Sequence, residues 1–83
     1  MVTVLYFAAL RERLGRASDW IDLEKPLPAG DLLARLRAAD PVVEAAFSVP
    51  GTIRVAVGQR LADEATIVNP GDEVAFFPPM TGG

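Results

Sequence analysis

The chain has 83 residues, of which 51% are hydrophobic and 23% are charged, and its formal net charge is −3. It contains neither cysteine nor histidine, which excludes disulfides, the usual zinc ligands and the usual nucleophile–base pairs, so we expect no metal site and no independent catalysis. Its 8 basic residues form no stripe and its longest apolar run, residues 4–10, is far too short to cross a bilayer, so we expect neither nucleic-acid binding nor a membrane span.

The first half of the chain predicts two strands and two helices. Residues 2–8 are rich in β-branched and aromatic types and predict a first strand. Residues 9–14 predict a short helix that ends at Gly15, a residue type favoured just after a helix. Residues 20–23 predict a second strand, which ends at the Pro-Leu-Pro run that follows. Residues 31–39 predict the main helix, with three leucines forming its apolar stripe.

The second half predicts strands joined by tight turns. Residues 42–47 predict a further short helical turn after Asp40-Pro41. The remaining predicted elements are a strand at 53–57, a type II′ hairpin turn at Gly58-Gln59, a return strand at 60–62, a type II turn at 69–72 and a final strand at 73–77.

This order of elements predicts an α+β roll of the ubiquitin-like β-grasp type, a mixed sheet with one main helix packed on it. In that arrangement the first and last strands lie parallel at the centre of the sheet. We expect residues 1–77 to form the domain and residues 78–83 to form an extended tail. Pro78 and Pro79 cannot donate to a ladder, so they end the pairing and hold the chain extended.

The sequence closes on Gly82-Gly83, which predicts a free carboxylate on a stalk without side chains. Such a stalk can enter a channel too narrow for other residues, where a partner enzyme could activate the carboxylate. The alternative interpretation is a loose glycine tail without a function.

Two segments carry a resemblance to a known family. Residues 4–12 (Val-Leu-Tyr-Phe-Ala-Ala-Leu-Arg-Glu) and 71–83 (Gly-Asp-Glu-Val-Ala-Phe-Phe-Pro-Pro-Met-Thr-Gly-Gly) closely resemble the small subunits of molybdopterin synthase, the MoaD-like sulfur carriers with a ubiquitin fold. The resemblance runs nearly end to end. Gly58 stands where the family usually has asparagine; both tolerate positive φ, so we expect the turn to survive but assign Gly58 no binding role. Met80 replaces a more common valine.

The resemblance implies a chemistry for the terminus. A ubiquitin-activating-like enzyme would use ATP to adenylate Gly83, and a sulfur donor would convert the acyl-adenylate into a thiocarboxylate. The tail, with Gly82 before the reactive Gly83, would then enter the large synthase subunit. Two such sulfurs would build the dithiolene of molybdopterin from a cyclic pyranopterin phosphate. The chain itself would bind no cofactor.

An apolar cluster beside the tail is predicted to meet the partner. If Tyr6 and Phe76 point inward, alternation turns Phe7 and Phe77 outward, and Leu61 can join them. The alternative is a core covered by loops. The predicted partner contacts are Phe7, Arg11, Leu61, Phe77, Pro78, Pro79, Met80 and Thr81, although Arg11 could equally belong to a solvated helix face.

Other functions stay open at this point. Gly83 could instead form an isopeptide bond with a lysine of a target, which would make the chain a protein modifier. It could carry sulfur for thiamine or another product, although the Phe-Phe-Pro-Pro run argues against thiamine by analogy. The chain could also be a β-grasp binding module with an incidental tail. Because Met1 leads straight into a strand-like segment, we expect no signal peptide and a cytoplasmic protein.

Overall fold

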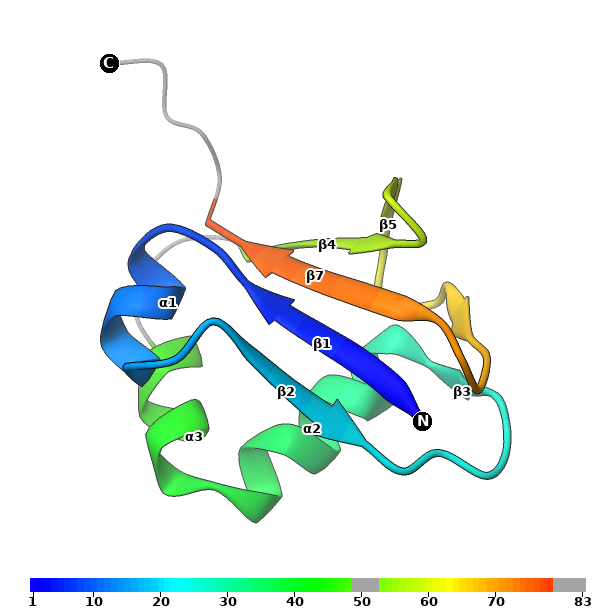
Figure 1. Ribbon diagram of the computed structural model, residues 1–83, viewed down its shortest axis with the longest axis horizontal. Coiled ribbons are helices and arrows are strands. Elements are labelled where there is room, and N and C mark those ends of the chain that lie inside the picture. Colours follow the sequence, from blue (N-terminus) through cyan, green and yellow to red (C-terminus); the bar gives the residue numbers. More distant parts are fainter. Residues whose placement is uncertain (49–52, 79–83) are drawn as a thin grey trace.

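A mixed sheet forms the framework of the molecule (Figure 1). In residues 1–48 and 53–78, which the computed structural model describes, five strands lie in the order β2-β1-β7-β4-β5. They are β1 (Val2–Tyr6), β2 (Ser18–Ile21), β4 (Arg54–Val57), β5 (Arg60–Ala62) and β7 (Glu73–Phe77). β1 and β7 pair in parallel, whereas the other neighbours pair antiparallel. The prediction that the first and last strands run parallel inside the sheet is therefore confirmed.

The second strand lies two residues earlier than predicted. The sequence favoured residues 20–23, but the antiparallel ladder with β1 pairs Leu5 with Ser18 and Val2 with Ile21. The N–H of Tyr6 also donates to the carbonyl of Ala17 at 2.9 Å, which extends the ladder toward the turn. Register with β1, rather than local propensity, thus decides where β2 begins and ends.

A second, two-stranded sheet was not predicted. It pairs β3 (Leu27–Pro28) with β6 (Ile67–Val68), where the sequence had indicated only the end of a strand. The N–H groups of Ala29 and Gly30 then donate to carbonyls of the 64–66 turn, at 2.8 and 2.9 Å. These bonds satisfy two N–H groups that a helix start leaves without partners. They explain why the main helix begins at Ala29, two residues before the prediction.

Three described helices cover one side of the main sheet: α1 (Ala9–Leu14), α2 (Ala29–Ala39) and α3 (Pro41–Phe47). α1 ends at Gly15, whose φ of 72° is left-handed, as the sequence predicted. Asp40 separates α2 from α3, and its carboxylate accepts a hydrogen bond from the N–H of Val42 at 2.9 Å. The short helical turn predicted at 42–47 is therefore a capped helix with proline in its first turn.

The core lies between these helices and the inward face of the sheet. On β1 and β7 every second side chain is buried, and Tyr6 and Phe76 both point inward as predicted. The ring of Phe47 from α3 contacts both, with centroids 6.4 Å from Tyr6 and 5.4 Å from Phe76. Burial of each such side chain stabilises the fold by about 1.5–3 kcal/mol. The buried core residues are Val2, Val4, Tyr6, Leu10, Leu14, Leu23, Ala29, Leu32, Leu36, Val43, Ala46, Phe47, Val55, Val68, Val74 and Phe76.

Of the two predicted turns, one differs in type. Gly58 and Gln59 have φ of 58° and 68°, and positive φ at both central residues defines a type I′ turn rather than the predicted type II′. The turn at 69–72 agrees with a type II turn, because Gly71 has φ of 94° and the N–H of Asp72 donates to the carbonyl of Asn69 at 3.0 Å.

Candidate partner-docking surface

The outward face of the main sheet carries the predicted apolar cluster. Phe7 follows β1 directly, and its N–H donates to the carbonyl of Phe76 at 3.1 Å, which holds Phe7 next to Phe77. Phe7 is 46% exposed and Leu61 is 67% exposed, while Phe77 is half-buried. The alternation inferred from sequence therefore places all three residues on the same side of the sheet.

Leu61 lies on β5, which is separated by β4 from the strand that carries Phe77. It lies opposite Ala56, which lies opposite Ala75, which lies opposite Leu5. Because neighbouring strands are about 4.8 Å apart, Leu61 stands about 10 Å across the sheet from β7. The surface between them is formed by small, half-buried side chains, so the face is shallow and broad rather than a pit.

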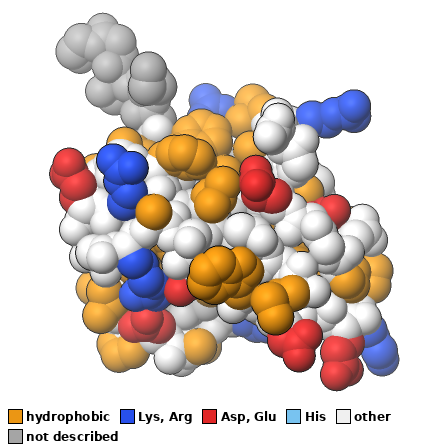
Figure 2. Space-filling view, in the orientation of Figure 1, with side chains coloured by type: hydrophobic (Ala, Val, Ile, Leu, Met, Phe, Trp, Pro, Cys, Tyr) orange, Lys and Arg blue, Asp and Glu red, His pale blue; other side chains and the backbone are white. Residues whose placement is uncertain are grey.

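Leu5, Ala56 and Ala75 therefore belong to this surface, although the prediction did not include them. Strand parity could have indicated two of them, since Leu5 alternates with Phe7 on β1 and Ala75 alternates with Phe77 on β7. Ala56 on β4 joins them through its pairing with Ala75. We call the set Phe7, Leu61, Phe77, Leu5, Ala56 and Ala75 the outer apolar face. Figure 2 shows hydrophobic side chains gathered over the ends of β1 and β7 and, separately, over β2. No helix of the described residues packs on this side.

Charged residues border the outer apolar face at the end where β7 finishes. Arg54 pairs with Phe77 in the ladder and is exposed, a neighbour that the sequence prediction missed. The predicted contact Arg11 is exposed on α1 and forms no ion pair with any described residue. By contrast, Asp63 and Asp72 accept hydrogen bonds from backbone N–H groups of their own turns, so they have structural roles.

The predicted tail lies mostly beyond what the structure describes. Pro78, directly after β7, is half-buried. Pro79, Met80, Thr81, Gly82 and Gly83 fall outside the described residues, so the predictions made for them stay predictions.

The backbone immediately after Phe7 takes an unusual conformation. Ala8 has φ of 52° and ψ of −127° and serves as the N-cap of α1 without a side-chain cap. A non-glycine residue in such a region costs on the order of 1–3 kcal/mol unless its surroundings compensate. This bend turns the chain from β1 into α1 and leaves Phe7 on the outward side.

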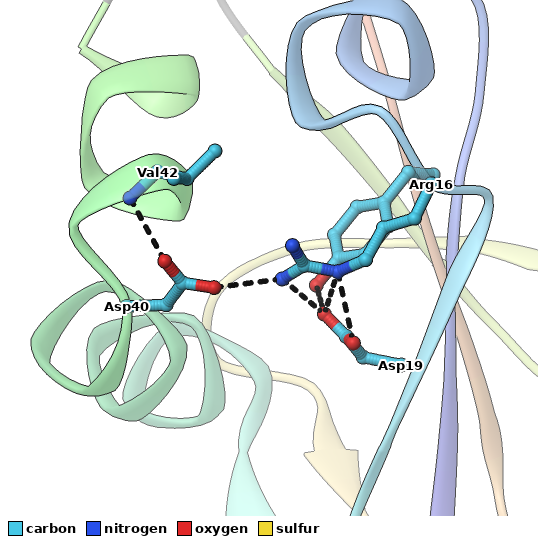
Figure 3. A network of polar contacts seen from close by, with 5 residues as sticks. Arg16, Asp19, Asp40 and Val42 are labelled. Atoms are coloured by element: carbon cyan, nitrogen blue, oxygen red, sulfur yellow. Dashed lines mark hydrogen bonds and ion pairs between the residues drawn. The ribbon is translucent and has the colours of Figure 1, made fainter.

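A polar network braces β1 and β2 against the helices from the inward side (Figure 3). Arg16 donates to both carboxylate oxygens of Asp19, at 2.8–3.0 Å, and to Asp40 at 2.9 Å, while the Tyr6 hydroxyl donates to Asp19 at 2.8 Å. Burial and the hydrogen bond to Asp19 raise the pKa of Tyr6. The N–H of Val42, followed by the Arg16 guanidinium, lowers the pKa of Asp40. The network thus joins strands β1 and β2 to the α2–α3 junction at Asp40.

The sequence matches the family model described as the ThiS family over residues 4–83. The chain belongs to the ThiS family. One relative, the molybdopterin synthase sulfur carrier subunit of Escherichia coli, is 37% identical over 83 residues, which is 100% of both chains. The crystal structure of SAMP1, a small archaeal modifier protein from Haloferax volcanii, superimposes with a TM-score of 0.80 at 29% identity, and the match covers 99% of this chain and 98% of that one.

A third similar structure bears on the fold alone. The protein–protein complex of subunits 1 and 2 of the molybdopterin-converting factor from Helicobacter pylori contains a chain with a TM-score of 0.67 at 22% identity, covering 99% of this chain and 97% of that chain. Together with the sheet order, these likenesses confirm the predicted β-grasp fold for this member of the ThiS family.

Proposed function

We propose that this chain is the sulfur-carrier subunit of a molybdopterin synthase. The observation that carries the proposal is the end-to-end similarity to a sulfur carrier subunit of that enzyme, with 37% identity across all 83 residues. The family match extends to residue 83, so the two closing glycines lie within it. A sequence without cysteine or histidine agrees with a carrier whose reactive group is the main-chain terminus.

The proposed chemistry takes place at Gly83. An oxygen of its carboxylate attacks the α-phosphorus of ATP on an adenylating enzyme that resembles ubiquitin-activating enzymes, and pyrophosphate leaves. A sulfur donor then displaces AMP from the acyl carbon, which leaves a thiocarboxylate. Gly82 and Gly83 add no side chain to this stalk, so it can pass through a narrow channel to the partner's catalytic groups. The thiocarboxylate sulfur finally attacks a cyclic pyranopterin phosphate, and water then cleaves the acyl–sulfur bond, which leaves the sulfur on the pterin and restores the carboxylate of Gly83.

The outer apolar face supports docking of the large synthase subunit. Exposed apolar surface at the base of the tail is favourable only when a partner removes it from water. We propose that Phe7, Leu61 and Phe77 contact that subunit, with Arg11 at the border. Residues 78–81, which are Pro78, Pro79, Met80 and Thr81, would line the path of the tail into it.

Intact mass spectrometry tests the proposal. After incubation with ATP, the adenylating enzyme and a sulfur donor, we expect one oxygen of the chain to be replaced by sulfur, and fragmentation to place it at Gly83. A chain extended by one glycine beyond Gly83 is the matched control, and we expect it to support no cofactor synthesis. If the extended chain works as well as the original, the terminus is not the reactive group.

A second candidate is a protein modifier, and the likeness to SAMP1 favours it. The same adenylate could be attacked by a lysine amine of a target, with AMP leaving and an isopeptide bond forming. Denaturing gels of cells that express a tagged chain separate the two functions. Conjugates that require Gly83 indicate a modifier, whereas loading with sulfur in the absence of conjugates indicates a carrier.

A further inference from the structure

Trp20 is the most conspicuous apolar side chain outside the surface described above. It lies on the edge strand β2, it is the only tryptophan of the chain, and it is 67% exposed. A tryptophan buries a large apolar area when it meets a partner, and tryptophan is enriched among the residues that dominate binding energy. Its exposure therefore calls for an explanation that folding alone does not give.

The register places Trp20 on the same side of the sheet as the outer apolar face. Trp20 lies opposite Thr3, two positions along β1 from Leu5, and Leu5 itself lies opposite Ser18 on β2. Trp20 and Leu5 are thus diagonal neighbours, whose Cα atoms stand about 7–8 Å apart in such a pair, within reach of an indole ring. Figure 2 shows the hydrophobic surface over β2 on the side that also displays β1 and β7.

The size of a stable interface requires more surface than the tail end provides. Such interfaces bury about 800 Å² on each partner, contributed by roughly 20–30 residues. The tail end offers far fewer residues than this: Phe7, Leu61, Phe77 and the six residues of the predicted tail. From the tail end, the adjoining α1 surface is charged, with Arg11, Glu12 and Arg13 exposed. The sheet surface toward β2 instead carries the half-buried Leu5 between Phe7 and Trp20, with the uncharged polar residues Ser18 and Thr3 opposite Leu5 and Trp20.

We propose that the large subunit covers the outward side of the sheet as far as Trp20, which acts as a second anchor at the end of the face remote from the tail. This inference rests on the proposed function, because it assigns a further contact to the same partner. The partner would present an apolar pocket to Trp20 and shallower contacts to the alanines between the two anchors.

The chain has a single tryptophan, so its tryptophan fluorescence comes from Trp20 alone. In the complex, the signal stays specific to Trp20 if the tryptophans of the large subunit are replaced by analogues that absorb at other wavelengths. We expect titration with the purified large subunit to shift the Trp20 emission to shorter wavelength. Calorimetry should show that W20A weakens binding about tenfold or more, while W20F, which keeps an aromatic surface, loses less. V42A changes an exposed side chain on the helical side of the molecule and should alter the affinity by no more than about twofold.

The outcomes separate the inference from the function beneath it. If the large subunit binds with unchanged Trp20 emission and W20A binds as tightly as the original chain, Trp20 lies outside the footprint, and the proposed function is untouched. If the large subunit fails to bind the original chain, the docking proposal itself is wrong. If the emission shifts with the concentration of this chain alone, a second copy occupies the surface, and the inference is also overturned. Far-UV circular dichroism of W20A establishes that the variant is folded.

Discussion

The two sides of the main sheet are built from the same strands, yet only one of them is covered by the described helices. On the inward side, Tyr6 and Phe76 are buried against Phe47 and the helices. On the outward side, their sequence neighbours Phe7 and Phe77 are also aromatic, but no described helix covers them. Apolar residues on both sides of a strand are expected where both sides are covered. In this chain the second cover is absent from the described part of the domain, which is why we assign it to a partner.

Adjacent residues on β1 and β7 therefore contribute to different properties: those that point inward stabilise the fold, and those that point outward are available for binding. Truncation of a side chain that points inward should lower the free energy of unfolding. Truncation of its outward-pointing neighbour should instead lower the affinity for the partner.

The adjacent pair Phe76 and Phe77 provides the strongest test. We expect Phe76→Ala to lower the free energy of unfolding by about 3–5 kcal/mol, because it opens a cavity beside Tyr6 and Phe47. This is a large part of the roughly 5–15 kcal/mol that holds a domain together. Phe77→Ala should cost about 1 kcal/mol or less and should weaken binding of the large subunit instead. Urea denaturation of both variants measures the difference, and equal losses of stability would contradict the two-sided description.

A smaller effect is expected where the inward side meets the polar network. Tyr6→Phe removes the hydrogen bond to Asp19 and should cost about 1.5 kcal/mol, since the acceptor is charged but keeps its ion pair with Arg16. Because the pKa of Tyr6 is raised in the folded state, its contribution is complete below the unfolded value near 10 and is lost as the pH rises above it.

The alkaline behaviour is measurable because Tyr6 is the only tyrosine. Phenolate absorbance should stay low in the folded protein above pH 10 and rise when the protein unfolds. The original chain should lose stability in this range, and Tyr6→Phe should lose less. A tyrosine that titrates normally in the folded protein would show that the hydroxyl is not held as described.

On the outward side the expected effect is on docking alone. Phe7→Ala should weaken binding of the large subunit about tenfold, which corresponds to about 1.4 kcal/mol, while the urea midpoint stays nearly unchanged. Ile67→Ala is the matched control, because Ile67 is similarly exposed but belongs to β6 in the small second sheet. Comparable losses of affinity for both variants would mean that the outward side of the main sheet is not a distinct docking surface.

Sequence reasoning succeeded where side chains alternate over a complete strand, as in β1 and β7, and it therefore placed Phe7 and Phe77 on the outward side of the sheet. It misplaced β2, because Trp20, Ile21 and Leu23 favour a strand locally, whereas pairing with β1 ends the strand at Ile21 and leaves Leu23 buried outside it. The short strands β3 and β6 have too few residues to show any period. Arg54 and Trp20 join the surface only through strand register, which is a long-range property that one sequence does not display.

The smallest expected effect concerns Ala8, the residue that connects the end of β1 to helix α1. Ala8→Gly should raise the free energy of unfolding by about 1 kcal/mol, because glycine adopts the φ of 52° without strain and this gain exceeds the flexibility that it adds to the unfolded chain. Gly15→Ala is the opposite control, since it places a side chain at φ of 72° where glycine is native, and it should destabilise the protein. Calorimetric binding then decides what the bend does. If Ala8→Gly is more stable and docks as tightly as the original chain, the bend is only a connection between β1 and α1. If it is more stable but docks more weakly, the strained backbone of Ala8 holds Phe7 in its outward position. Docking then depends on the backbone conformation after β1 as well as on the side chains of the sheet.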